Sequence, residues 1–477
     1  MPSLGDSELC FMSARELAQL IRIRRTSARE VMGAFLRQIN RLNPKINAIV
    51  AKLDDVKCLA LADDADRRIA RGEEIGALHG LPFAFKDLDP AVGFPMTRGS
   101  KIFKDFVPAE DSVLVERLKR AGVIAIGKTN VSEFGMGSHT YNDVYGTTLN
   151  PYDLTKSAGG SSGGAGAALA AGLLPIASGS DLGGSLRNPA NFNNIVALRP
   201  SIGLVPSAPT ALPFLGFTVN GPMARSVADV AWLLSVMAGA DARDPACYPS
   251  QPQELAAPLD RNFNGVRIAW CPDLGGLALD RRVRSVLEKQ PKTFSDLGCI
   301  VDDACPDLSG ADEIFLTIRA WNYWHTLGPL LEKHRHEMKP EAVWQIELGS
   351  KLSGEDVAQA MTRHGELMQR MRRFQEKYEF LLCAVNQVPP FDATIAWPRE
   401  IEGVKMETYL DWMKSAYWIT PTFCPAISVP AGFTDDGLPV GIQIVGRYRD
   451  DLGVLQIAYA FEQATGFARR RPNIVLQ

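Results

Sequence analysis

Two serines lie inside glycine clusters in the segment 158–189, AGGSSGGAGAALAAGLLPIASGSDLGGSLRNP. Ser161 stands in GGSSGG and Ser185 in DLGGSLR, with a predicted helix of small residues (165–173) between them. Glycine is used where the backbone takes unusual angles or approaches a ligand closely. A serine hydroxyl becomes a nucleophile when a nearby base removes its proton. The segment therefore indicates covalent chemistry at a serine.

Other catalytic and binding patterns fit this segment poorly. A phosphate-binding loop needs a lysine after its last glycine, and none occurs between Lys156 and position 200. A dinucleotide fingerprint needs a third glycine where Leu169 stands. The chain has no His-Glu-x-x-His and no paired cysteines of the kind that bind zinc. We therefore expect neither a metal nor a cofactor.

The pattern Gly-x-Ser-x-Gly around Ser161 also matches a nucleophile elbow, which follows a strand and needs a downstream histidine. The preceding residues 152–158, YDLTKSA, are polar and do not predict a strand. The later histidines, such as His334 and His336, lie in charged helical stretches. These features disfavour a serine–histidine–aspartate site.

A lysine is the remaining type of base, because burial lowers its pKa and leaves a neutral amine. Lys86 ends the apolar run GLPFAF (80–85), but a surface lysine at a strand end is the commoner role. The chain contains no Ser-x-x-Lys, so the base must come from a segment distant from the serines. The residues alone leave its identity open.

The elements that position these residues alternate between helix and strand, which predicts an α/β fold. We expect a large mixed, mostly parallel β-sheet with helices on both faces. Asp-Gly in TDDGLPV indicates a turn between the last two strands. The predicted strands are 80–85, 123–127, 265–271, 380–386, 426–433 and 441–446, and helices are expected at 111–121 and 226–239.

The chain is expected to form a single domain over residues 1–477. Two amphipathic helices are predicted within about 13–44, beginning at Ser13 and at Thr26 or Ser27 and ending near Asn43-Pro44. A charged helical excursion at about 277–380 is expected to shape one side of a cleft.

Composition narrows the class of protein. The 477 residues are 46% hydrophobic and 22% charged, with a net charge of −3, which is typical of a globular protein with neither nucleic acid nor a membrane as partner. The uncharged stretch within 157–180 is rich in Gly, Ala and Ser and contains Pro175, so no membrane span is expected. Eight scattered cysteines and the lack of a secretory signal predict reduced thiols and a cytoplasmic location.

Taken together, these motifs resemble the amidase signature enzymes. GGSSGG (159–164) and DLGGSLRNPA (181–190) are similar to the two halves of that signature, with the serines 24 residues apart as in the family. KDL (86–88), AGVIAIGKTNVSEFGMGS (121–138) and AISVPAGFTDDGLPVGIQIVG (426–446) resemble its other blocks. The resemblance runs from about residue 13 to 465.

The resemblance implies a Ser-Ser-Lys triad and the amidase signature fold. Ser185 would be the nucleophile. Ser161, after a cis non-proline peptide bond, would relay a proton to Lys86, which acts as base and then as acid. The backbone N–H groups of Leu182, Gly183 and Gly184, with that of Ser185, would form the oxyanion hole.

Further residues are assigned by the same resemblance. Ser162, Asp181 and Arg187 would support the triad, and the segment Gly135, Met136 and Gly137 would form part of the acyl pocket. Leu182 stands where many members have threonine, which leaves its backbone role intact. Five aromatic residues either line a substrate pocket or pack in the core: Trp321, Tyr323, Trp324, Trp397 and Tyr417.

The implied function is hydrolysis of a small-molecule amide through an acyl-enzyme, extending to aryl amides, esters or carbamates, by an enzyme that forms a homodimer. The alternative is an amidotransferase A-type subunit that releases ammonia from glutamine within a tRNA-dependent complex. A catalytically inactive binding protein is the third hypothesis, and the complete set of triad residues argues against it.

Overall fold

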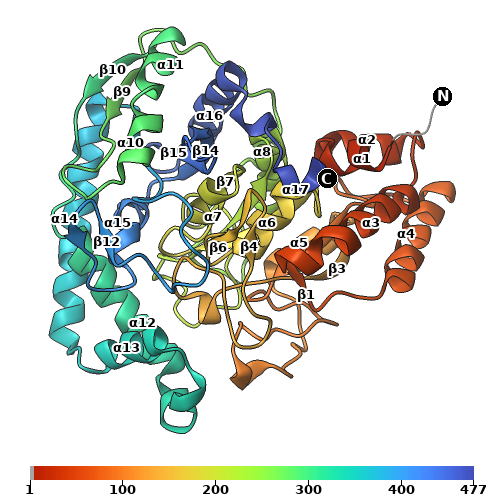
Figure 1. Cartoon of the computed structure of the whole chain (residues 1–477), viewed down its shortest axis with the longest axis horizontal. Coiled ribbons are helices and arrows are strands. Elements are labelled where there is room, and N and C mark those ends of the chain that lie inside the picture. The colour runs from red at the N-terminus through yellow and green to blue at the C-terminus, as the bar shows by residue number, and fades with distance from the viewer. Residues whose placement is uncertain (1–4, 477) are drawn as a thin grey trace.

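A sheet of eight strands forms the centre of the molecule in the computed structural model, which describes residues 5–476 (Figure 1). Across the sheet the strands are β10 (Ile300–Asp303), β9 (Arg267–Trp270), β11 (Phe380–Ala384), β15 (Pro439–Val445), β14 (Ala426–Phe433), β7 (Val196–Arg199), β8 (Val219–Ala224) and β6 (Ile176–Asp181).

The pairing of these strands confirms a mixed sheet, but the expected predominance of parallel pairs is wrong. Only β10–β9 and β9–β11 are parallel, and the other five neighbouring pairs are antiparallel. Helix α7 (Arg187–Phe192) does connect β6 to β7 as helix–strand alternation suggests. However, β8 lies between those two strands and runs antiparallel to both. Local alternation does not reveal such an insertion.

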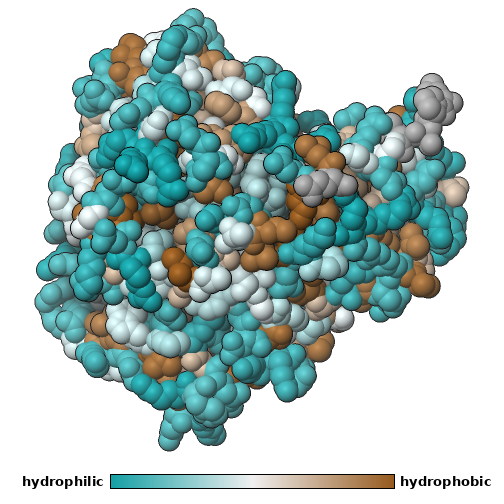
Figure 2. Space-filling model, in the orientation of Figure 1, coloured by the Kyte–Doolittle hydropathy of each residue, from teal (hydrophilic) through white to brown (hydrophobic). Residues whose placement is uncertain are grey.

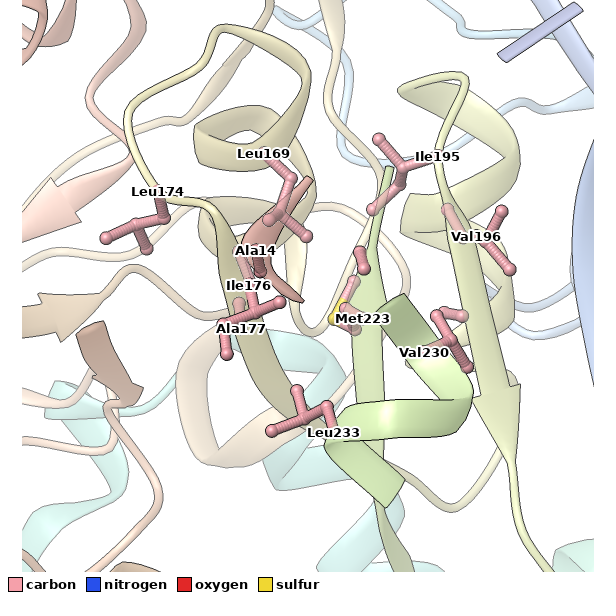
Figure 3. Close-up of a cluster of buried hydrophobic side chains, with 14 of the residues drawn as sticks. Ala14, Leu169, Leu174, Ile176, Ala177, Ile195, Val196, Met223, Val230 and Leu233 are labelled. Atoms are coloured by element: carbon pink, nitrogen blue, oxygen red, sulfur yellow. The ribbon is translucent and has the colours of Figure 1, made fainter. Parts of the chain in front are cut away.

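Both faces of the sheet are buried and covered by helices, as expected. In β11, Phe380 and Leu382 belong to one hydrophobic core, and Leu381 and Cys383 to another, because successive side chains point to opposite faces. The first core includes residues of α6 (Gly163–Ala170), α8 (Val227–Met237) and α16 (Asp451–Thr465). Figure 3 shows side chains of α6, β6, β8 and α8 meeting in it.

The second core lies under the predicted helical excursion. Residues 277–380 hold α10 (Arg281–Leu287), α11 (Gln290–Asp296), α12 (Ala311–His334), α13 (Pro340–Ser350) and α14 (Gly354–Lys377). The segment also supplies β10, which joins the edge of the sheet. Side chains of α12 and α14 contribute to the second core. The assignment of one domain to the whole chain stays a prediction.

A small sheet presents the lysine strand. Its order is β1 (Ile49–Val50), β3 (Ile124–Thr129) and β2 (Pro82–Lys86), with β2 and β3 parallel. All five residues of β2 are buried, and Lys86 is its last residue. The strand predicted from the apolar run before Lys86 is therefore confirmed.

Helices at the N-terminal end of the described chain follow the capping signals. α2 (Ala14–Arg22) begins at Ser13, whose hydroxyl accepts the Glu16 N–H, and α3 (Ala28–Ile46) begins with a capping box of Ser27 and Glu30. The predicted end near Asn43-Pro44 is wrong, because α3 continues to Ile46. The carbonyl that Pro44 leaves without its helical N–H belongs to Asn40, which is exposed to water.

The remaining helices are short or peripheral. They are α1 (Asp6–Phe11), α4 (Asp55–Ala70), α5 (Val113–Arg120), α9 (Pro252–Leu255), α15 (Lys414–Tyr417) and α17 (Asn473–Leu476). Hydrophilic residues cover most of the face shown in Figure 2, and hydrophobic residues form small patches on it. Among residues 5–476, no helix combines the length and the apolar character needed to cross a bilayer.

The segment before Ser161 is a strand, contrary to what its polar composition predicted. β5 (Asp153–Ser157) pairs antiparallel with β4 (Leu149–Asn150) in a two-stranded ribbon. Most of its residues are only half-buried, so the ribbon forms without the apolar run that marks a core strand.

The expectation that all eight cysteines are reduced is wrong for one pair. Cys271 and Cys305 form a disulfide, with their Cα atoms 5.2 Å apart. They follow the parallel strands β9 and β10, whose carboxyl ends meet at the same edge of the sheet. Strand pairing, and not sequence spacing, brings them together. The other six cysteines are free thiols.

The backbone of helix α6 packs directly against the backbone at Ala48 and Asn130, and this close packing predicts how a substitution changes stability. A Cβ added at Gly164 would lie 2.3 Å from Asn130 N and 2.6 Å from Ala48 O. We expect Gly164→Ala to destabilise the fold by about 1–3 kcal/mol, as overpacking does. The matched control is Gly365→Ala in α14, where nothing lies within 4 Å and alanine stabilises a helix by about 1 kcal/mol. Equal unfolding midpoints for the two variants in urea would contradict the close packing.

Candidate active site

Lys86 is completely buried at the end of β2 and lies among three serines. Its Nζ donates to Ser161 Oγ (2.9 Å), to Ser162 Oγ (2.8 Å), and to Ser180 Oγ (3.0 Å). Burial lowers the pKa of Lys86 from 10.5 to about 7, although the negative charges of Asp89 and Asp181 oppose the shift. A large share of this amine is therefore neutral near pH 7.

Ser161 and Ser162 stand immediately before α6. The Gly160–Ser161 peptide bond is cis, as the resemblance implied. Gly159 has φ +72°, and a Cβ there would lie 3.0 Å from Pro189 Cα. This position therefore accepts only glycine, and the two glycine-rich segments pack in contact. The Ser162 N–H donates to the Ser185 carbonyl oxygen at 3.3 Å.

Ser185 lies on the short loop between β6 and α7, and it is buried. The Asp181 carboxylate holds this loop from both sides of the serine. It accepts the Gly184 N–H at 2.8 Å and the Leu186 N–H at 3.2 Å. Gly184 has φ +104°, and a Cβ there would lie 2.6 Å from Ala416 Cβ. The loop conformation thus requires glycine before the serine.

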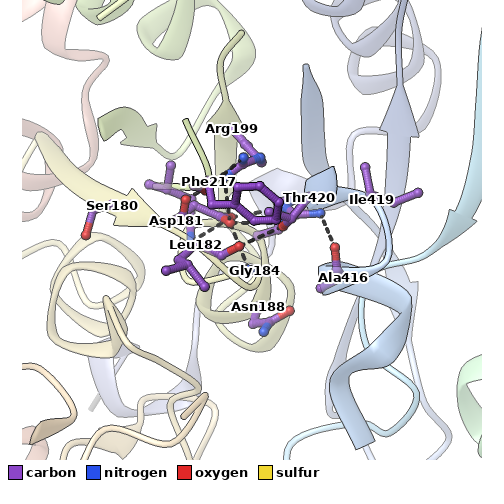
Figure 4. A network of polar contacts seen from close by, with 12 residues as sticks. Ser180, Asp181, Leu182, Gly184, Asn188, Arg199, Phe217, Ala416, Ile419 and Thr420 are labelled. Atoms are coloured by element: carbon purple, nitrogen blue, oxygen red, sulfur yellow. Dashed lines mark hydrogen bonds and ion pairs between the residues drawn. The ribbon is translucent and has the colours of Figure 1, made fainter. Parts of the chain in front are cut away.

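Two buried arginines, Arg187 and Arg199, pair with the one charge of Asp181, and Figure 4 labels Arg199 beside it. Arg187 Nη2 lies 3.0 Å and Arg199 Nη1 lies 3.3 Å from Asp181 Oδ1. Arg187 also donates to the Ala416 carbonyl, and Arg199 to that of Phe217. Burial by itself raises the pKa of Asp181, but the two guanidinium groups outweigh it and hold that pKa well below its ordinary value. The carboxylate therefore stays ionised.

One of the four backbone N–H groups that the resemblance assigned to the oxyanion hole is already bonded within the protein. Gly184 was among them, yet its N–H already donates to Asp181. The N–H groups of Leu182, Gly183 and Ser185 donate to no group within residues 5–476. These three amides remain available to a substrate oxygen.

The segment Gly135–Gly137 lies beside Ser161, and its role as a wall of the acyl pocket stays a prediction. A Cβ on Gly135 (φ +73°) would lie 3.5 Å from Ser161 Oγ. A Cβ on Gly137 would lie 3.6 Å from the Tyr409 ring. Met136 is buried between them. The absence of a side chain at Gly135 keeps the space next to Ser161 open.

A cavity of about 260 Å³ lies near Lys86, on the side of Ser180. Its lining includes Leu88, Ser180, Asn220, and Asn322 of α12. Ser180 connects this cavity to the lysine, because its hydroxyl accepts from Lys86 Nζ. The cavity has room for a small ligand close to the base.

Sequence reasoning missed Ser180 and Arg199. An arginine inside the apolar strand VALR was the available signal, since a buried charge needs a partner. Ser180 carried no signal of its own.

Of the five aromatic candidates, Tyr417 and Trp397 lie near the site, and Trp324 does not. Tyr417 stacks on Phe315 with ring centroids 4.3 Å apart, and a Cβ on Gly183 would lie 3.0 Å from Phe315. Trp397 lines a small hollow with Met136. Trp324 is 40% exposed, so it belongs neither to the pocket nor to the core.

Comparison with known proteins gives a consistent picture. The Amidase family profile matches residues 30–455. An acylamidase of Rhodococcus erythropolis is 35% identical over 98% of both chains. The A-type subunit of a glutamyl-tRNA(Gln) amidotransferase from Cyanothece sp. is 33% identical over 97% of this chain and 100% of its own.

Solved structures agree with these relatives. A bacterial aryl acylamidase of the amidase signature family superimposes with a TM-score of 0.90 at 27% identity, over 96% of this chain and 98% of its own. A 6-aminohexanoate cyclic dimer hydrolase gives 0.86 at 26% identity, over 98% and 99%. The chain belongs to the amidase signature family and is an amide C–N hydrolase.

Proposed function

We propose that this amidase works through a Ser-Ser-Lys triad, with Ser185 as nucleophile, Ser161 as relay and Lys86 as base. The observation that carries the proposal is the buried Lys86 amine, with a pKa of about 7, in hydrogen-bond contact with Ser161. A general base works best when its pKa lies near the working pH. The loop contact between Ser162 and Ser185 supports the placement of the nucleophile next to this pair.

The proposed reaction begins with a proton shift. Neutral Lys86 accepts the proton of Ser161, which takes that of Ser185 as the Ser185 oxygen attacks the amide carbonyl carbon. The negative oxygen of the tetrahedral intermediate accepts from the amides of Leu182, Gly183 and Ser185, each worth about 3 kcal/mol in the transition state. The C–N bond breaks as the proton returns through Ser161 to the leaving amine. Water then hydrolyses the acyl-enzyme by the same relay.

The proposed substrates are amides of small molecules, with aryl amides, carbamates and esters as extensions. The 35% identity to an acylamidase and the structural similarity to an aryl acylamidase support the acyl amide class. The cavity of about 260 Å³ beside Ser180 lies just below the range of about 300–1,000 Å³ that is typical of ligand pockets, which favours small substrates. A hydrolysis screen over aliphatic amides, anilides, carbamates and esters, with Ser185→Ala as control, tests the range.

A second candidate is an amidotransferase A-type subunit, favoured by the 33% identity to such a protein. It requires partner subunits and glutamine as ammonia source. Copurification with partners from its native cell, together with glutaminase activity, would support it. Hydrolysis of acyl amides by the isolated chain, with no activity on glutamine, would eliminate it. A cytoplasmic location, a homodimer and a single domain stay proposals drawn from the sequence.

Serine variants test the triad. We expect Ser185→Ala to lower hydrolysis by about 10³-fold or more and Ser161→Ala to leave a small residual activity, because the nucleophile is lost in one and only the relay in the other. Ser178→Ala is the matched control, since Ser178 is buried in β6 and its hydroxyl has no hydrogen-bond partner among the described residues. Initial rates on an anilide measure the effect. Parent-like activity of Ser185→Ala would refute the assignment.

The pKa of Lys86 predicts the pH profile. Below about pH 7 the amine is protonated and accepts no proton, so kcat/KM should rise through about pH 7 and stay high under alkaline conditions. Asp89 raises the pKa of Lys86, so Asp89→Asn should move the rising limb to lower pH. Circular dichroism at each pH checks that the enzyme is folded. A profile that falls above neutrality in folded enzyme would contradict Lys86 as base.

A further inference from the structure

Helix α12 forms a wall of the site, and Arg319 stands in the middle of that wall. Phe315, one turn before Arg319, meets Gly183 of the loop that carries Ser185. Asn322, one turn after it, lines the cavity of about 260 Å³. Residues three and four positions apart lie on one face of a helix. Arg319 is therefore on the face of α12 that is turned toward the site.

Arg319 is a buried cation without an acidic partner. Its exposed fraction is 3%, and no carboxylate within residues 5–476 lies within 4.0 Å of its guanidinium. The other fully buried arginines, Arg187 and Arg199, both pair with Asp181. A buried charge is costly unless it is paired. Arg319 differs from Arg187 and Arg199 because it lacks the carboxylate partner that normally offsets the cost of burying a charge.

The neighbours of Arg319 are neutral. The side-chain oxygen of Gln345 accepts from its Nη1, and the rings of Tyr323 and Tyr409 lie 4.8 and 5.5 Å from its Cζ. The same Gln345 oxygen accepts the Tyr409 hydroxyl at 3.5 Å. These contacts hold the guanidinium in place without neutralising it.

Arg319 and Gln345 together carry more N–H donors than the acceptors around them can bind. A guanidinium carries five N–H donors, and its contacts with Gln345 and the Tyr409 hydroxyl occupy only part of them. Gln345 Nε2 is a further buried donor without a partner among the described residues. An ionised carboxylate only accepts, and it offers two oxygens to such donors. The group is therefore suited to an anionic acceptor.

Two contacts place Arg319 relative to the proposed triad. Tyr409, which touches Arg319, lies beside Gly137, and Gly135 of the same loop lies beside Ser161. On the other side, Phe315, one turn before Arg319 in α12, lies against Gly183 in the loop of Ser185. A ligand group bound by Arg319 is thus within reach of a small substrate whose amide sits at the serines.

We propose that Arg319, with Gln345, binds a carboxylate of the substrate, so that this enzyme favours amides carrying a negative charge. The inference rests on the proposed function and specifies its substrate class. The charge is placed either on the acyl part or on the amine part of the substrate. One charged anilide for each position distinguishes the two.

Three anilides test the preference: neutral acetanilide, N-phenylsuccinamic acid with the carboxylate on the acyl part, and 4-acetamidobenzoate with it on the amine part. We expect one charged anilide to exceed acetanilide in kcat/KM by about 10-fold or more. Arg319→Gln should lower kcat/KM for that anilide by about 10- to 100-fold, mainly through KM, because a charge-assisted bond is lost. Acetanilide should change by less than about 2-fold, and Arg319→Lys should keep part of the preference.

Two results would overturn the inference. One is a parent enzyme that hydrolyses neither charged anilide better than acetanilide. The other is an Arg319→Gln variant that loses activity equally on all three, which indicates a purely structural role for the bond to Gln345.

Calorimetric binding to the Ser185→Ala protein separates this inference from the triad. The favoured charged anilide should bind more tightly than acetanilide, and Arg319→Gln should remove the difference. Equal affinities would reject the carboxylate site even if the triad is correct. A difference in affinity without any hydrolysis by the parent enzyme would support the carboxylate site and reject the triad.

Discussion

The buried carboxylate of Asp181 is the interaction on which the geometry of the site depends. It joins α7 through Arg187, β7 through Arg199, and the loop of Ser185 through the N–H groups of Gly184 and Leu186. Breaking a buried pair by removing one partner typically costs about 3–5 kcal/mol, so these segments stay in register. The same charge raises the pKa of Lys86 and limits how far burial lowers it.

Lys86 and the serines come from segments far apart in the chain. These segments can meet because glycines, which lack side chains, let them pack closely. Gly159 lies against Pro189 and Gly184 lies against Ala416, so closely that an added Cβ would be 3.0 Å and 2.6 Å from them. The glycines therefore act mainly by allowing close approach of backbones, and not by providing mobility. Dense packing also excludes water around Lys86, which is the physical cause of its low pKa.

The helical excursion adds a wall whose electrostatics differ from those of the triad. Around Asp181 every buried charge has an oppositely charged partner, because Arg187 and Arg199 share one carboxylate. On α12, Arg319 is surrounded by Gln345 and two tyrosine rings, which are neutral. In the proposed mechanism, the paired charges around Asp181 position the reacting groups, and the unpaired charge of Arg319 selects the substrate. This division places chemistry and substrate choice on different parts of the chain.

Local patterns in the sequence determined the strand that ends at Lys86, the capped starts of α2 and α3, the two strands around TDDGLPV and the residue types of the site, because these depend on near neighbours in the chain. The choice of Lys86 came from resemblance to a family. Only the tertiary structure decided the antiparallel insertion of β8, the Cys271–Cys305 bond, the commitment of the Gly184 N–H to Asp181 and the isolation of Arg319. Each of these depends on which distant segments meet in space, and sequence periodicity carries no record of such meetings.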